Sequence, residues 1–153
     1  MKTTEKYGKN ADLALSLWVK LARASDSVAI LSSRDITRYG LTVPQFGVLE
    51  TLGHLGPMTV GTICSKKLSS GGNMTVVVDN LEKEGIVERM QHPQDRRAIL
   101  VRLTRKGKKL FEKIFVQHAS YIEQLIWSTL TENEIIQLSN LLKKLGLSLK
   151  QKL

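Results

Sequence analysis

The fold is decided by residues 59–103, which read TVGTICSKKLSSGGNMTVVVDNLEKEGIVERMQHPQDRRAILVRL. Apolar residues at helical spacing predict a short helix over 60–67 and, after a polar turn, a second helix from residue 71 or 72 to about 84. The period then changes to partial alternation at 86–91 and 98–103. This change predicts an antiparallel hairpin with a polar, basic tip.

Further helices are predicted on both sides of this stretch. A capping box at Thr42–Gln45 opens one helix before it, and a second box at Thr131–Glu134 opens the last helix of the chain. The segment 11–33 carries two apolar stripes, which is typical of a helix that packs against two neighbours, either within the chain or in a second subunit. The order of elements predicts a mainly α protein with six helices and a small antiparallel β wing, a winged helix-turn-helix.

The charge of the chain limits the classes of partner that it can bind. The chain has 23 Lys and Arg against 14 Asp and Glu, a net charge of +9 and a pI near 9.8. Such a surplus suggests a polyanionic partner. Between residues 89 and 109 Asp95 is the single acid among many basic residues, so the surplus is local, as a binding face requires.

The expected compartment is the cytoplasm, for a soluble protein. The single cysteine, Cys64, excludes an internal disulfide framework. No apolar run approaches the roughly 18 residues that a membrane span needs. The N-terminus lacks a basic-then-apolar signal pattern.

The start of the second helix has residue types suited to reading DNA in a major groove. Small and hydrogen-bonding side chains can reach base edges there, and a helix N-terminus offers N–H groups to phosphates. The candidate contacts are Ser69, Ser70, Gly72, Asn73, Thr75 and Val76. Phosphate contacts are expected from Lys66, Lys67 and Arg102, with Arg105 and Lys106 as further candidates. The alternative is an ordinary capped helix preceded by a loop.

The hairpin tip adds a second candidate contact. Asp95, Arg96 and Arg97 stand in the polar turn. A narrow minor groove attracts an inserted arginine, and an aspartate two residues away can hold that arginine's direction. A solvated charged turn is the alternative, and it is less favoured when the turn follows a helix-turn-helix.

The runs LEKEGIVER (81–89), DRR (95–97) and VRLTRKG (101–107) together resemble the MarR (multiple antibiotic resistance regulator) family. The resemblance extends over roughly residues 10–147. It implies a dimer formed by the first and the last two helices, a recognition helix in the major groove, and Arg97 in the minor groove with Asp95 as its orienting partner. The segment 68–73 is similar to that of family members that respond to quinones or other phenolic compounds.

The resemblance also implies the organisation and the function. We expect a single domain over 1–153, with the DNA-binding winged helix-turn-helix at about 41–103 and dimerisation helices at about 10–38 and 104–147. The expected function is a sequence-specific transcriptional repressor, released from a pseudo-palindromic operator by a small aromatic or phenolic effector. Trp18, Arg23 and Tyr39 are the candidate ligand-binding residues. The expected partners are double-stranded DNA and a second copy of the chain, with no membrane and no cofactor.

Other functions have weaker support. A redox or quinone sensor acting through Cys64 is one alternative, although a buried, inert thiol is the favoured interpretation. A winged helix used for protein contacts without a specific DNA target is another. His54, His92 and His118 lie far apart without companion ligands, so no metal site is expected. No pairing of nucleophile and base suggests an enzyme.

Overall fold

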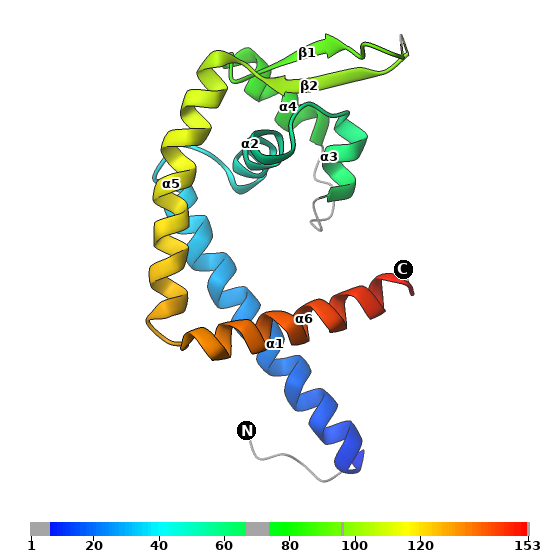
Figure 1. The fold of residues 1–153 in the computed structure, drawn as a ribbon, viewed down its shortest axis with the longest axis vertical. Helices are drawn as coiled ribbons and strands as arrows, with labels where there is room; N and C mark the ends of the chain where they lie inside the picture. Colours follow the sequence, from blue (N-terminus) through cyan, green and yellow to red (C-terminus); the bar gives the residue numbers. More distant parts are fainter. Residues whose placement is uncertain (1–6, 67–73, 96, 153) are drawn as a thin grey trace. The chain divides into compact units, whose positions relative to one another are not determined.

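The computed structural model describes residues 7–66, 74–95 and 97–152 (Figure 1). These residues form six α-helices and a two-stranded sheet. The elements are α1 (Lys9–Thr37), α2 (Val43–Leu55), α3 (Val60–Lys66), α4 (Met74–Lys83), β1 (Val87–Gln91), β2 (Ile99–Leu103), α5 (Arg105–Trp127) and α6 (Glu132–Lys150). The predicted mainly helical fold with an antiparallel β wing is confirmed. Among these helices, none combines the length and apolar character needed to span a membrane.

The chain divides into two compact units, Met1–Glu112 and Lys113–Leu153. The first unit contains α1 to α4, the hairpin and the first turns of α5, and the second contains the rest of α5 and α6. The expectation of a single domain over 1–153 stays a prediction.

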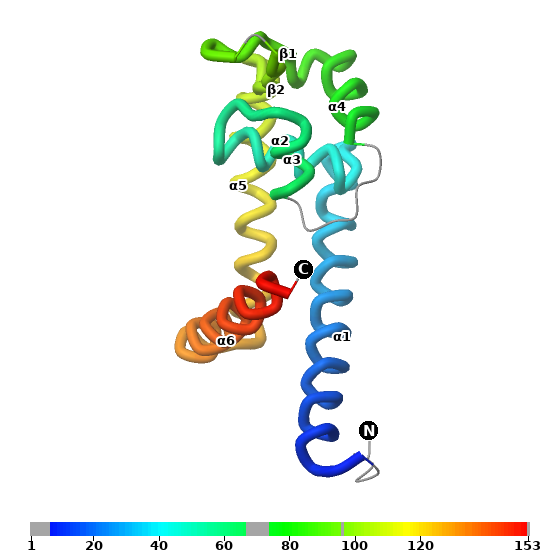
Figure 2. The backbone as a smooth tube through the Cα atoms, turned by 90° about the vertical axis from the view of Figure 1, so that its right-hand side faces the viewer, coloured from blue at the N-terminus to red at the C-terminus, as the bar shows by residue number. Residues whose placement is uncertain are grey.

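α1 runs four residues past the segment 11–33 whose apolar stripes predict it, and α6 runs three residues past residue 147, the expected end of the dimerisation helices. α1 continues to Thr37 because its last turn is anchored by the buried side chain of Ile36. Figure 2 shows it as one uninterrupted helix. α6 continues to Lys150 through Gly146, since one exposed glycine weakens a helix by only about 1 kcal/mol and does not end it.

Within the first unit, α2, α3, α4 and the hairpin lie together (Figures 1 and 2). They share one apolar core. Each element contributes at least one side chain that is almost fully buried. These side chains are Val48, Leu49, Ile63, Val78, Leu81, Val87 and Val101. The predicted capping box opens α2: the Thr42 hydroxyl accepts the Gln45 N–H at 3.3 Å, and the Gln45 side chain accepts the Thr42 N–H at 2.9 Å.

β1 and β2 pair antiparallel, from Val87 opposite Leu103 to Gln91 opposite Ile99. The link before α3 joins the sheet through Met58, whose N–H donates to the Val101 carbonyl at 3.1 Å and whose carbonyl accepts from the Val101 N–H at 2.8 Å. This isolated bridge places a third backbone segment beside β2.

The first turn of α5 lies directly against the end of α4 and the start of β1. The Thr104 hydroxyl donates to the Gly85 carbonyl at 2.7 Å and accepts from the Gly107 N–H at 3.0 Å. The Lys106 Nζ donates to the Glu84 carbonyl at 2.7 Å. A Cβ at Gly107 would lie only 2.0 Å from the Ile86 carbonyl oxygen, so this approach requires glycine. The base of the hairpin is therefore held between two helices.

Gly107→Ala should destabilise the protein, because the new methyl group meets a backbone oxygen that cannot rotate away. Overpacking of this kind costs about 1–3 kcal/mol, and we expect the upper end of that range. Gly61→Ala in α3 is the matched control, since the nearest atom to its Cβ is a side-chain oxygen at 3.9 Å. Urea unfolding followed by circular dichroism measures both. Equal midpoints for the two variants would contradict the contact.

Candidate DNA-binding interface

α4 separates core-facing from solvent-facing side chains. Met74, Val78 and Leu81 are buried, with exposed fractions of 7%, 0% and 0%. Thr75 is exposed, and 45% of Val76 is accessible. The helix can therefore offer a hydroxyl and an apolar side chain to a partner while its other side is held in the core.

The structure describes only part of the predicted interface. Lys66 ends α3 and is exposed. Six predicted contact residues lie outside the described residues: Lys67, Ser69, Ser70, Gly72, Asn73 and Arg96. Their roles stay predictions.

The wing turn is held by side chains that accept backbone N–H groups. The Asp95 Oδ1 accepts the Arg97 N–H at 2.9 Å. The His92 Nδ1 accepts the N–H groups of Gln94 and Asp95 at 3.1 and 3.2 Å, and the His92 N–H donates to the Ala98 carbonyl at 3.0 Å. Asp95 thus orients Arg97 through its backbone, and the Arg97 side chain remains exposed. His92 was not predicted to have this role, because a histidine acceptor is not one of the usual turn signals.

Several cations of the basic stretch are engaged within the protein. The Arg102 Nε lies 2.8 Å from the Glu88 Oε1 across the hairpin, and Lys106 donates to the Glu84 carbonyl. Arg89 pairs with carboxylates of α4. By contrast, Arg97 and Arg105 are exposed and form no ion pair within the described part of the chain. The local charge available to a partner is therefore smaller than the sequence count indicates.

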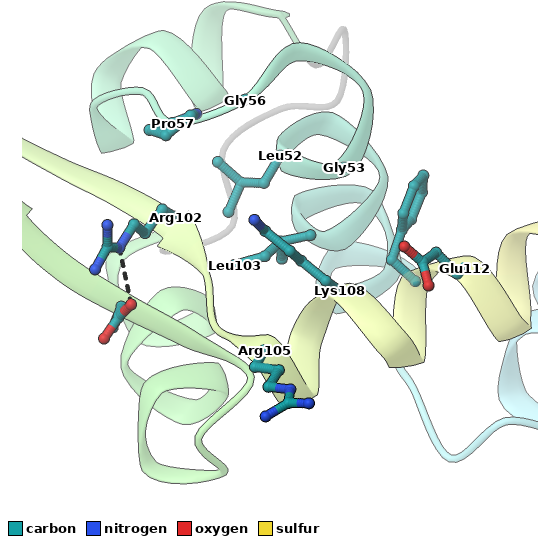
Figure 3. A pocket seen from close by; sticks show the side chains of 11 residues that line it. Leu52, Gly53, Gly56, Pro57, Arg102, Leu103, Arg105, Lys108 and Glu112 are labelled. Atoms are coloured by element: carbon teal, nitrogen blue, oxygen red, sulfur yellow. Dashed lines mark hydrogen bonds and ion pairs between the residues drawn. The ribbon is translucent and has the colours of Figure 1, made fainter.

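A pocket of about 660 Å³ opens beside the hairpin base (Figure 3). Its apolar surface comes from Leu52, Leu103 and Phe111, and its charged groups include Arg102 and Lys108. The full lining is Leu52, Gly53, Gly56, Pro57, Glu88, Arg102, Leu103, Arg105, Lys108, Phe111 and Glu112. This volume is within the range that holds small ligands.

The three predicted ligand-binding residues are not gathered by the fold of one chain. Trp18 is 65% exposed on α1, and Arg23 is exposed on the next turns of the same helix. Tyr39 follows the end of α1 and is half-buried, and burial, together with the charge of Asp35, raises the pKa of its hydroxyl. None of the three lines the pocket above. Their ligand-binding role stays a prediction.

Cys64 lies in α3 and is half-buried, less buried than expected from the sequence. Its helix has only seven residues, and the side chain that it buries completely is Ile63. Among the described residues, no cluster of His, Cys, Asp and Glu could hold a metal ion. His54 instead packs edge-to-face on Phe111, with ring centroids 5.1 Å apart.

Comparison with known proteins places this architecture. The model of the MarR family matches residues 41–99. The transcriptional regulator MhqR of Bacillus subtilis is 37% identical over 90% of this chain and 94% of its own. The multiple antibiotic resistance protein MarR of Salmonella typhimurium is 32% identical over 69% of this chain and 73% of its own.

A solved structure agrees with the sequence relatives. A variant of MarR from E. coli, in complex with operator DNA, has a TM-score of 0.75 and 25% identity, over 90% of this chain and 99% of its own. The relatives of this chain are transcriptional regulators and not enzymes. This protein is likewise a regulator and not an enzyme. The chain belongs to the MarR family of winged helix-turn-helix, DNA-binding transcriptional regulators.

Proposed function

We propose that the chain is a repressor that binds a pseudo-palindromic operator as a homodimer and leaves it when a small aromatic or phenolic ligand binds. The observation that carries DNA reading is the wing tip, where Asp95 holds the backbone of the exposed Arg97. A narrow minor groove concentrates negative potential and attracts an arginine presented in this way. Thr75 and Val76 on α4 then read base edges in the adjacent major groove.

Phosphate contacts position these reading groups. Lys66 is exposed at the end of α3, close in sequence to the predicted contacts that lie outside the described residues. Arg102 is half-exposed beside Glu88 and can exchange that carboxylate for a phosphate oxygen. Such contacts set affinity and register, and they carry no sequence information themselves.

Arg97→Ala should weaken operator binding by more than about tenfold, since one groove-reading arginine contributes about 1–3 kcal/mol. Arg34→Ala, which removes an exposed arginine from α1, is the control and should bind as the unaltered protein does. Footprinting and titration at matched salt, on DNA from the promoter beside the gene, measure both. Equal affinity of the two variants would remove Arg97 from the reading role. A wild-type protein that protects no defined sequence would favour the protein-contact alternative.

The dimer is supported by apolar surface that the single chain leaves in water. None of the residues of α6 is buried. Large apolar side chains nevertheless recur along it at spacings of three and four. They include Ile135, Leu138, Leu142, Leu145 and Leu149, of which the last four are 45%, 41%, 37% and 49% exposed. An exposed apolar stripe of this kind is unusual on a monomer, and it supports an interface on this helix.

α1 has the same character. Leu13, Leu17 and Trp18 are 61%, 59% and 65% exposed, although all three stand on a helix with many apolar positions. Two-fold pairing through such surfaces presents two recognition helices about 34 Å apart, one turn of DNA. One winged helix alone contacts only a few base pairs, so pairing is also what specific binding requires.

Leu138→Asp combined with Leu142→Asp should turn the dimer into a monomer, because burying two carboxylates in the interface is costly. Both side chains are already exposed in the single chain, so its own core is not disturbed. The matched control is Gln137→Asp with Asn140→Asp, which adds two negative charges at exposed polar positions of the same helix. Sedimentation equilibrium gives the mass. A dimer that survives the leucine substitutions would exclude α6 from the interface.

Two inputs can be separated by experiment. The second candidate is a redox or quinone response through Cys64, whose thiol is only half-buried. Reversible release instead requires a ligand that binds more tightly to a dimer whose recognition helices have a spacing that does not fit DNA.

Hydroxybenzoates and catechols, added to the protein–operator complex under reducing conditions, should release the DNA from the wild type and from Cys64→Ser alike. Trp18→Leu should weaken the response by about tenfold, the cost of a lost aromatic contact. Fluorescence anisotropy of labelled operator measures release, and sedimentation confirms that each variant is still a dimer. Loss of the response in Cys64→Ser would establish the thiol as the sensor. Loss in Lys108→Met instead of Trp18→Leu would move the ligand to the pocket of Figure 3.

A further inference from the structure

Arg89 of β1 extends across to α4 and makes three polar contacts with that one helix. Its Nη2 lies 2.5 Å from the Asp79 Oδ1, and its Nη1 donates to the Glu82 carboxylate. Its backbone N–H also donates to the Glu82 Oε1, at 3.0 Å. The strand that leads to the wing is thereby tied at Asp79 and Glu82 to α4, the proposed recognition helix.

The charge of Arg89 is paired with carboxylates of the protein itself. Hydrogen bonding to Asp79 is the main cause that raises the pKa of Arg89, and the charge of Glu82 acts in the same direction. The side chain of Arg89 is 29% exposed, less than those of Asp79 and Glu82 at 43% and 36%. Arg89 is thus a partly covered cation between two carboxylates, in spite of its place in a basic stretch.

The apolar core restricts the roll of α4 about its axis less sharply than directional hydrogen bonds do. Val78 and Leu81 bury one side of the helix, but hydrophobic contact is not directional. Hydrogen bonds to a planar guanidinium are directional, and their strength falls steeply with angle. A roll of about 20° moves a side-chain tip about 6 Å from the axis by about 2 Å, enough to lose a base contact.

We propose that Arg89 is a positioning residue, which sets the roll of the recognition helix relative to the wing. Thr75 stands one turn before Asp79 on α4, and the wing turn begins directly after β1. Arg89 joins the two elements at this point, so the base-reading side of α4 and the wing arginine Arg97 approach DNA in a fixed register. This inference rests on the proposed sequence-specific binding and adds to it a residue that controls specificity without touching DNA.

The test compares Arg89→Met and Arg89→Lys with the wild type, on operator and on random DNA over a series of salt concentrations. Both variants should lower the ratio of operator to random affinity by about tenfold, a loss comparable to one mismatched base pair. Arg89→Lys should fail although it keeps the charge, because lysine lacks the planar fork. The slope of log affinity against log salt should not change, since no phosphate contact is lost.

Lys66→Met is the comparator for a phosphate contact. It should lower operator and random affinity alike and reduce the salt slope by about 1. The same reduction of the slope in Arg89→Met, with an unchanged affinity ratio, would overturn the proposal and make Arg89 a phosphate contact. An unchanged ratio in Arg89→Lys would also overturn it.

Further measurements distinguish a positioning role of Arg89 from a role limited to stability, and failure of this inference from failure of the proposed function. All titrations are made well below the unfolding midpoint of each variant, so a role limited to stability would leave the affinity ratio unchanged. If Arg89→Met does not fold, Arg89→Lys carries the test. Backbone amide shifts of Thr75 and Val76 in the free protein should move in the variants, and unchanged shifts would contradict a change of roll. A wild type without operator preference would instead reject the proposed function.

Discussion

The first turn of α5 approaches the peptide groups of residues 84–86 so closely that no side chain fits between them. Gly107 permits that approach, and Thr104 and Lys106 donate to the carbonyl groups left at the end of α4. The end of α4, both ends of the hairpin and the start of α5 thus meet at one point. The contacts of Arg89 with Asp79 and Glu82 add a second connection between the hairpin and α4.

The protein uses its positive charge in two ways. Some cations have acidic or carbonyl partners within the first unit and hold its elements in place; these are Arg89, Arg102 and Lys106. Exposed cations such as Arg97 can attract an anionic partner. Exposed pairs contribute little to stability individually, so the value of the internal contacts is mainly geometric. A net charge of +9 therefore describes long-range attraction better than it describes the number of contacts with DNA.

Much of the fold could be predicted because its boundaries have local signals. The Thr42–Gln45 capping box begins α2, and Gly85, with a φ of 67°, follows the end of α4. The partners of the cations could not be predicted. Asp79 lies ten residues before Arg89, so that pair depends on how α4 packs against β1. Glu88 lies opposite Arg102 because of the register of the hairpin, which the predicted strand ranges 86–91 and 98–103 do not specify. The half-burial of Cys64 likewise depends on neighbours that the residues beside it do not specify.

The junction also bears on the order of assembly. Its contacts join segments about twenty residues apart, Gly85 with Thr104 and Glu84 with Lys106, and the hairpin pairs residues that are closer still. Contacts at short sequence separation form quickly, because little chain entropy is lost in closing the loop. We therefore expect this junction to reach its native arrangement in a fast step at any protein concentration. In the proposed dimer, pairing of two chains through α1 and α6 depends on concentration and is slower in dilute solution, so the junction would form before the two chains pair.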